Sequence, residues 1–222
     1  MTKKQRKLII FGTGDFAEVV YFYFSHESKY DVVAFTADSN FIEQDKFCDI
    51  PVLDFATVSE LYAPIDYDMF VAVGYQKVND VRAQKCKEAK AKGYRLVSFV
   101  SENCINYAKS IGENCFIFED NTIQPFVEIG NNVVMWSGNH VGHHSKIGDN
   151  SFITSHAVIS GGVEIGKNCF IGVNSTIRDA INIADYTVVG AGALIMKNTK
   201  EREVYMSDRT PIFRRPSDRI GM

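Results

Sequence analysis

Four of the chain's five histidines fall within 17 residues, at His140, His143, His144 and His156. An imidazole changes charge near neutral pH, so a histidine in an open site suits general acid–base chemistry. Clustered histidines also suggest zinc. Their spacings of 3, 4, 12, 13 and 16 residues do not match the multiples of 18 that the repeat described below requires of stacked ligands, so we expect no metal. A histidine-rich contact between subunits is the third interpretation.

A second candidate site is a Gly-x-Gly-x-x-Ala turn that begins at Gly12, between an expected strand and an expected helix. Small residues there let the backbone approach a phosphate, and the helix N-terminus presents unpaired N–H groups to it. Asp38 lies just past the second strand, where an acid can meet a ribose hydroxyl. We therefore expect Gly12, Gly14, Asp15 and Asp38 to bind a nucleotide. The alternative is a tight packing turn. A hydride-transferring enzyme would need a larger sheet and a substrate domain.

A six-residue repeat organises the second part of the chain. Isoleucine, valine or methionine occurs at every sixth position from Ile105 to Ile195. The fourth residue after each is usually small, and the residue that follows directly is often glycine. A period of six matches neither the alternation of a strand nor the 3.6 of a helix. It is typical of a left-handed parallel β-helix whose coils of 18 residues have three flat sides, and we expect about five coils.

The repeat also places the histidines relative to one another. His143 is the third residue of the hexad that begins at Val141, so its side chain projects outward. Gly161 occupies the same place on the next coil, about 4.8 Å along the axis. A histidine beside an exposed glycine backbone has room for a ligand and a peptide N–H nearby, which suits His143 to the role of general base. His144 follows it directly, and His140, at the end of the preceding hexad, would orient other groups.

The first hundred residues alternate between strand and helix patterns, which indicates a small parallel α/β sheet. Strands are expected over 7–11, 31–36, 68–73 and 94–100, and helices over 18–24 and 77–92. We expect a Rossmann-like nucleotide-binding domain over 1–103, a left-handed β-helix domain over 104–200 and a C-terminal extension over 201–222.

Composition excludes several classes of protein. The 222 residues are 45% hydrophobic and 23% charged, as in ordinary globular proteins, and the formal net charge of -3 offers no attraction for nucleic acid or anionic lipid. Five scattered cysteines without a CxxC pair indicate reduced thiols. No signal-peptide core or membrane-length apolar run occurs. We expect a cytoplasmic protein that binds neither nucleic acid nor membrane.

From about residue 6 to residue 200 the chain resembles the family of sialic-acid O-acetyltransferases and nucleotide-amino-sugar N-acetyltransferases. The segment 165–175, IGKNCFIGVNS, is especially similar. The resemblance implies that the α/β domain binds the nucleotide, that the β-helix trimerises and that acetyl-CoA lies in the groove between subunits. It also implies the roles of His143 as base and of Gly161 as the N–H that contacts the thioester.

The chain departs from this family in three places. Relatives commonly follow the base with an orienting glutamate, where this chain has His144. The usual Gly-x-Pro-Ala-Lys ending is replaced by residues 206–211, MSDRTP, and the usual paired aspartates after the second strand appear as Ala37 and Asp38. The first departure affects the residue that orients the base, and the last affects which nucleotide the protein binds.

Together these features predict an acetyl-CoA-dependent N-acetyltransferase that acts on a UDP-, dTDP- or GDP-linked amino sugar for bacterial surface glycan synthesis. We expect Asn139 and His140 to contact the substrate, Gly190 and Gly192 to contact acetyl-CoA together with Gly161, and the protein to be a homotrimer. The alternatives are O-acetylation of a sugar hydroxyl and a nucleotide-sugar-binding protein without catalysis.

Overall fold

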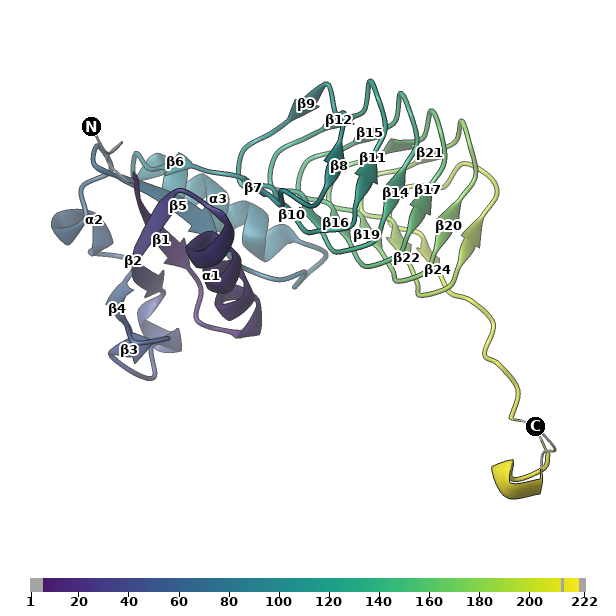
Figure 1. The fold of residues 1–222 in the computed structure, drawn as a ribbon, viewed down its shortest axis with the longest axis horizontal. Coiled ribbons are helices and arrows are strands. Elements are labelled where there is room, and N and C mark those ends of the chain that lie inside the picture. The colour runs from purple at the N-terminus through teal and green to yellow at the C-terminus, as the bar shows by residue number, and fades with distance from the viewer. Residues whose placement is uncertain (1–5, 213, 220–222) are drawn as a thin grey trace.

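A computed structural model of the chain describes residues 6–212 and 214–219. It contains an α/β domain followed by a three-sided β-helix, from which the last described residues extend as an arm that ends in the short η2 (Ser217–Arg219) (Figure 1). Within these residues, no helix has the length and apolar character needed to cross a membrane.

The α/β domain is built on a six-stranded sheet of order β3-β4-β2-β1-β5-β6, with helices on both faces. Its elements are β1 (Arg6–Phe11), α1 (Asp15–Glu27), β2 (Tyr30–Ala37), η1 (Ser39–Phe41), β3 (Lys46–Phe47), β4 (Ile50–Asp54), α2 (Val58–Leu61), β5 (Tyr67–Val71), α3 (Asp80–Ala91) and β6 (Arg95–Leu96). All pairs are parallel except β3 with β4, an antiparallel edge hairpin. The predicted elements are present except that the expected strand over 94–100 is split into β6 and β7 (Phe99–Val100), and β7 belongs to the β-helix. The elements β3, β4, η1 and the single turn of α2 were not predicted.

The β-helix has three faces of stacked two-residue strands, which we name by their number of strands. The seven-strand face holds β7 (Phe99–Val100), β10 (Phe116–Ile117), β13 (Val134–Met135), β16 (Phe152–Ile153), β19 (Phe170–Ile171), β22 (Val188–Val189) and β24 (Val204–Tyr205). The six-strand face holds β8 (Ile105–Asn106), β11 (Thr122–Ile123), β14 (His140–Val141), β17 (Val158–Ile159), β20 (Thr176–Ile177) and β23 (Leu194–Ile195). The five-strand face holds β9 (Ser110–Ile111), β12 (Glu128–Ile129), β15 (Lys146–Ile147), β18 (Glu164–Ile165) and β21 (Asn182–Ile183).

The predicted interior of the β-helix is confirmed from Ile111 onward. From Ile117 to Ile195 the large residue of each hexad is almost fully buried, and the small residue four places later lies beside it in the same core. The first step of the predicted repeat is wrong. Ile105 is 55% exposed, and Ile123 pairs with Asn106 instead, 17 residues earlier. The first coil is one residue short because only five residues separate Asn106 from Ile111, and Asn106 Oδ1 caps the backbone N–H of Ala108 at 3.0 Å in this corner.

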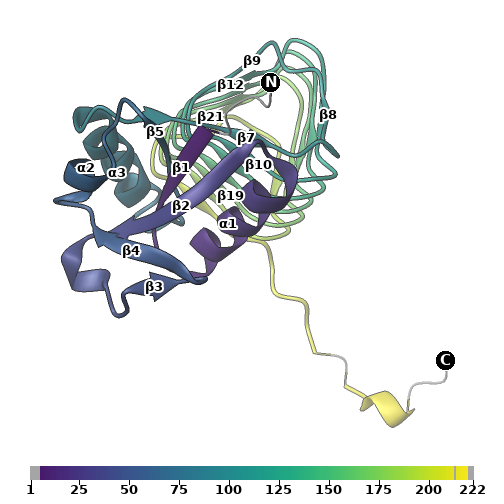
Figure 2. The same ribbon diagram turned by 60° about the vertical axis from the view of Figure 1, so that its left-hand side comes forward.

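Helix α1 lies between the α/β sheet and the seven-strand face, as Figure 2 shows. Phe116 of β10 reaches across this junction, with ring centroids 6.0 Å from Phe24 of α1 and 5.5 Å from Phe70 of β5. The aromatic layer belongs to one buried cluster that contains residues of both domains. Apolar packing of this kind holds the two domains in one orientation.

A buried arginine adds polar contacts to the same junction. Arg82 of α3 is fully buried and donates to Asn132 Oδ1 at 3.0 Å, to the Asn150 carbonyl at 2.9 Å and to the Gly74 carbonyl at 3.0 Å. Burial lowers the pKa of its guanidinium to about 10, so it stays charged at neutral pH. Its acceptors are all neutral oxygens, and they come from both domains.

Candidate functional site

The carboxyl ends of β1, β2 and β5 open into a cavity of about 680 Å³, which is a volume typical of small-molecule sites. Its wall combines the turn after β1, the loop and hairpin between β2 and β4, and one side of α3. Phe41 and Phe47 contribute apolar surface, and Asp38 and Lys85 contribute charge. In parallel α/β sheets, ligands bind at this edge of the strands.

Two glycines shape the floor of this cavity in different ways. Gly12 has a φ of +123°, and a Cβ there would lie 2.6 Å from the Ala72 carbonyl oxygen, so no other residue fits. A Cβ on Gly14 would meet nothing within 4 Å, so Gly14 leaves open space directly before the first turn of α1. Asp15 is exposed and does not line the cavity. The free amides of α1 therefore face a space that fits a phosphate.

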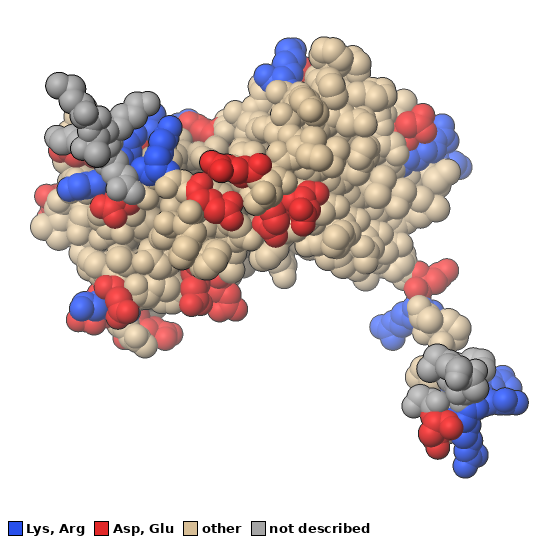
Figure 3. Space-filling view, in the orientation of Figure 1, with Lys and Arg blue, Asp and Glu red and all other residues tan. Residues whose placement is uncertain are grey.

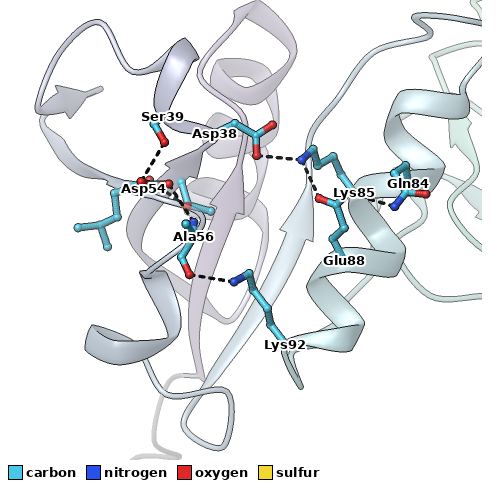
Figure 4. Close-up of polar contacts among 10 residues, drawn as sticks. Asp38, Ser39, Asp54, Ala56, Gln84, Lys85, Glu88 and Lys92 are labelled. Atoms are coloured by element: carbon cyan, nitrogen blue, oxygen red, sulfur yellow. Dashed lines mark hydrogen bonds and ion pairs between the residues drawn. The ribbon is translucent and has the colours of Figure 1, made fainter.

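Asp38 lines the cavity and binds Lys85 of α3, whose Nζ lies 2.8 Å from Asp38 Oδ1 and 2.7 Å from Glu88 Oε2 (Figure 4). Although burial disfavours the ammonium charge, hydrogen bonds to these two carboxylates raise the pKa of Lys85. The bond to Lys85 lowers the pKa of Glu88. Asp38 is thus held as a carboxylate acceptor at the end of β2, while Lys85 keeps its charge inside the cavity.

His143 lies at the corner between the six-strand and five-strand faces, which we call the six–five corner. Its ring packs on Gly161 of the next coil, where an added Cβ would lie 2.9 Å from both Cε1 and Nε2. The predicted stacking of these two residues is therefore present. The His143 side chain is exposed, and Gln124 Oε1 accepts a hydrogen bond from its backbone N–H at 2.9 Å.

His144 follows with a φ of +60°, and its Nδ1 lies 3.1 Å from Nδ1 of His143. One of these nitrogens must donate to the other. His144 also packs on Phe126, with 4.7 Å between ring centroids. This contact holds the His144 ring beside His143 at the place where the sequence suggested an orienting partner.

The backbone N–H of Gly161 is free of hydrogen-bond partners among the residues that the structure describes. Some equivalent amides, at the corner between the five-strand and seven-strand faces, are capped by side chains of the next coil: Asn131 N–H by Asp149 Oδ1 at 2.7 Å and Lys167 N–H by Asp185 Oδ1 at 2.8 Å. An uncapped N–H beside an imidazole can bind an oxygen atom that carries negative charge.

Asn139 and His140 lie apart from this pair. Asn139 is 1% exposed, and its side chain joins coils by donating to Asn121 Oδ1 at 2.9 Å and accepting from Ala157 N–H at 2.7 Å. Asn139 therefore lies in the interior of the β-helix and has no exposed surface that could contact a substrate. His140 is half-buried on the six-strand face, between Thr122 and Val158.

Gly190 and Gly192 lie at a different corner, between the seven-strand and six-strand faces, which we call the seven–six corner. A Cβ on Gly190 would lie 2.9 Å from the Tyr205 carbonyl oxygen, and Gly192 has a φ of +68°. Within one chain, these glycines and Gly161 border opposite edges of the six-strand face.

The cavity and His143 also lie on different sides of one chain. The α/β domain covers the seven-strand face, whereas the six–five corner is the corner opposite that face in a three-sided coil (Figure 2). The sequence-predicted nucleotide residues and the sequence-predicted base are therefore not brought together within a single subunit.

The cysteines offer no reactive thiol at these positions. Burial raises the pKa of both Cys115 and Cys169 to about 11, so these thiols stay protonated at neutral pH. Among residues 6–212 and 214–219, no group of three or more His, Cys, Asp or Glu side chains is arranged to hold a metal ion.

Sequence reasoning missed Lys85 and Gln124. Lys85 is one of six charged residues of α3, and nothing in the sequence distinguishes the one whose side chain lines the cavity. Gln124 lies 19 residues before His143, so the 18-residue stacking rule would have placed it close by.

Two family models match successive parts of the chain. Residues 7–89 match the PglD N-terminal domain, and residues 162–197 match the hexapeptide repeat of succinyl-transferase. No curated protein matches the chain.

Solved structures share the fold across both domains. The acetyltransferase domain of PglB from Neisseria gonorrhoeae is similar with a TM-score of 0.79 and 23% identity, over 90% of this chain and 95% of that one. Perosamine N-acetyltransferase from Caulobacter crescentus, in complex with CoA and GDP-perosamine, has a TM-score of 0.79 and 22% identity over 89% and 92%. WeeI from Acinetobacter baumannii AYE has a TM-score of 0.73 and 20% identity over 90% and 94%.

The order of a PglD N-terminal domain and a hexapeptide-repeat β-helix in one chain confirms the predicted fold class. Residues 7–89 thus belong to the PglD N-terminal domain family, and residues 162–197 belong to the hexapeptide-repeat family.

Proposed function

We propose that the protein transfers the acetyl group of acetyl-CoA to the amino group of a nucleotide-linked amino sugar. The observation that carries this proposal is the exposed His143 ring packed on Gly161, whose N–H is free among the described residues. A base and an oxyanion donor within one coil spacing are what aminolysis of a thioester requires. The relatives crystallised with acetyl-CoA, or with CoA and a GDP-amino sugar, support this choice of substrates.

In the proposed reaction, the sugar nitrogen attacks the carbonyl carbon of the thioester and forms a C–N bond. The carbonyl oxygen gains negative charge and accepts a hydrogen bond from the N–H of Gly161. His143 takes the proton that the nitrogen loses. Collapse of the tetrahedral intermediate breaks the C–S bond, and the CoA thiolate takes up the proton from His143. An amine is a sufficient nucleophile, so no covalent enzyme intermediate is needed.

The proposed mechanism requires one of the two tautomers that the contact between the two histidines allows. Nδ1–H of His143 would donate to Nδ1 of His144, across 3.1 Å, which leaves Nε2 of His143 as the free acceptor. Nε2 is also the ring nitrogen nearer to Gly161, since a Cβ added there would lie 2.9 Å from Nε2 and 3.3 Å from Nδ1. His144 thus orients the base as a neutral acceptor, whereas a carboxylate would add a negative charge beside the imidazolium.

The cavity at the ends of β1, β2 and β5 would hold the nucleotide. The diphosphate would lie against Gly12, Gly14 and the N-terminal amides of α1, and Asp38 would accept hydrogen bonds from the ribose hydroxyls. The charge of Lys85 offsets that of Asp38 beside an anionic ligand. Asp15, on the exposed first turn of α1, would border the cavity mouth without entering it.

We further propose a homotrimer, because the cavity and His143 of one chain face different ways. The outward residues of the six-strand face carry no formal charge, and Ile105, Val158 and Leu194 among them are 55%, 40% and 62% exposed. This part of the β-helix contributes to the wide tan area in Figure 3. By contrast, the five-strand face displays ion pairs such as Lys146 with Glu164.

With the six-strand faces turned toward a threefold axis, the six–five corner of one subunit meets the seven–six corner of the next. Acetyl-CoA would then lie in the groove between Gly161 of one subunit and Gly190 and Gly192 of its neighbour. Lys197 is exposed at the six–five corner three coils after His143, about 14 Å along the axis. Its charge suits the phosphates of CoA, which lie far from the thioester.

The experiment is a thiol-release assay with acetyl-CoA and a panel of UDP-, dTDP- and GDP-linked amino sugars, with mass spectrometry of the product. We expect thiol release with at least one of them and an acetamide in the product. An acetyl ester would indicate O-acetylation instead. Binding without thiol release would leave a nucleotide-sugar-binding protein. All five cysteines are free thiols, in keeping with a reducing, cytoplasmic location.

A further inference from the structure

His156 is a second exposed histidine with a specific backbone contact, and the proposed mechanism does not use it. It lies at the seven–six corner with a φ of +59°, which is uncommon for a residue other than glycine or asparagine. Equivalent positions on neighbouring coils carry Gly138, Asn174 and Gly192. The ring packs on Gly138, where an added Cβ would lie 2.5 Å from its Cε1 and Nδ1 atoms.

The imidazole nitrogens of His156 are free of hydrogen-bond partners among the described residues, and the side chain is exposed. The ring packs on the backbone of Gly138, so it adds little to the apolar core. The imidazole of His156 is thus exposed at this corner without a hydrogen bond to the described residues, which leaves it available to a ligand.

Phe16 connects the nucleotide cavity to the coils that carry this corner. It lines the cavity, and its ring lies 6.3 Å from that of Trp136 and 6.4 Å from that of Phe152. Trp136 comes two residues before Gly138, and Phe152 comes four residues before His156. The two coils that contact Phe16 thus carry Gly138 and His156 at the adjacent corner.

In the proposed trimer, His143 of a neighbouring subunit lies at nearly the same height along the β-helix axis as His156. His156 comes 13 residues after His143, and 18 residues advance the chain by one strand spacing, so the two differ by about 3.5 Å along the axis. A threefold axis parallel to the β-helix keeps these heights in every subunit. His156 of one subunit then faces His143 of its neighbour across the groove.

We propose that His156 binds the acceptor, by a hydrogen bond from its imidazole to a hydroxyl of the amino sugar. This inference rests on the proposed function and on the trimer. The diphosphate would occupy the space beside Gly14, so the sugar is the next group outward, between the cavity of its own subunit and the base of the next. His156 is then a substrate-binding residue that helps to aim the amine at the thioester.

The first test compares His156→Asn with the wild-type protein. Asparagine stands at the same corner position one coil later, at Asn174 with a φ of +54°, so the substitution keeps the backbone. We expect the KM of the most active amino-sugar nucleotide in the UDP, dTDP and GDP panel to rise about tenfold, with an unchanged KM for acetyl-CoA. The matched control is His26→Asn, which removes a histidine that packs on Phe22 of α1, and both KM values should stay unchanged.

Calorimetry makes the test independent of turnover. The Kd of the same sugar nucleotide should rise about tenfold in His156→Asn, while the Kd of the corresponding nucleoside diphosphate should not change. Equal affinities of the variant and wild type for the sugar nucleotide would overturn the inference. A wild-type protein that binds but releases no thiol would refute the proposed function alone, and the calorimetry would still decide the role of His156.

The second test asks whether His156 and His143 act across subunits. In trimers mixed randomly from His143→Asn and His156→Asn chains, about a quarter of the sites combine both wild-type histidines. We expect about a quarter of wild-type activity at a limiting acceptor concentration. If the two residues served one site within a single chain, no site would carry both wild-type histidines. About a twentieth of wild-type activity would then remain, from the His156→Asn chains. That lower value would overturn the inference.

Discussion

Replacing Gly161 by alanine should move the base without removing it. The new Cβ would lie 2.9 Å from Cε1 and Nε2 of His143, whereas ordinary contacts begin at 3.4 Å. The ring must therefore shift by about half an ångström or rotate away, and rotation is cheap because the side chain is exposed. A misplacement of this order in a reacting group costs roughly 10 to 10² in rate. We expect kcat to fall by that factor while the melting temperature changes little.

The measurement is the initial rate of CoA thiol release at saturating concentrations of both substrates, together with a thermal melt. Gly162→Ala is the matched control, because Gly162 has a φ of +67° and its added Cβ would lie 3.9 Å from the nearest atom. That variant should lose about 1 kcal/mol of stability through backbone strain and keep its kcat. The two neighbouring glycines thus separate an effect on the base from an effect on the fold.

Normal turnover in Gly161→Ala would refute the reasoning, because it would mean that the His143 ring does not work from its position over Gly161. Equal losses of kcat in both variants would also contradict it, since they would indicate a general disturbance of the corner.

Three further predictions concern the base, the cavity and the domain junction. His143→Asn should lower kcat by about 10² to 10⁴, while His144→Asn should lower kcat less; initial rates of thiol release check both, and a dead His144→Asn beside an active His143→Asn would reverse the assignment. Gly14→Val should raise the KM of the sugar nucleotide and leave the KM of acetyl-CoA and the melting temperature nearly unchanged, because its side chain enters open space in the cavity; a parallel rise of both KM values would argue against the division of sites. Arg82→Met should cost about 3 kcal/mol in urea unfolding, because it leaves buried carbonyl groups without donors; a loss below about 1 kcal/mol would show that water replaces the guanidinium.

The coil of the β-helix and the stacking of His143 on Gly161 could be predicted from the sequence because both follow from a local period. Each hexad makes one short strand and one corner, so residues 18 apart pair, as the registers from β9 to β23 show. The same rule failed at Ile105, where one corner is a residue shorter. The glycine turn after β1 was also predictable, because the conformation of Gly12 and the position of Gly14 before α1 depend on adjacent residues.

Contacts between distant segments were decided only by the tertiary structure. Lys85 reaches Asp38, 47 residues away, and Arg82 reaches Asn150, 68 residues away, because α3 packs beside both the sheet and the β-helix. A charge pattern along a helix does not specify which side chain a second domain will bury. Likewise, the period of six fixes heights along the axis but does not say which face the α/β domain covers. That choice, made by aromatic packing around Phe116, leaves the cavity and His143 on opposite sides of one chain.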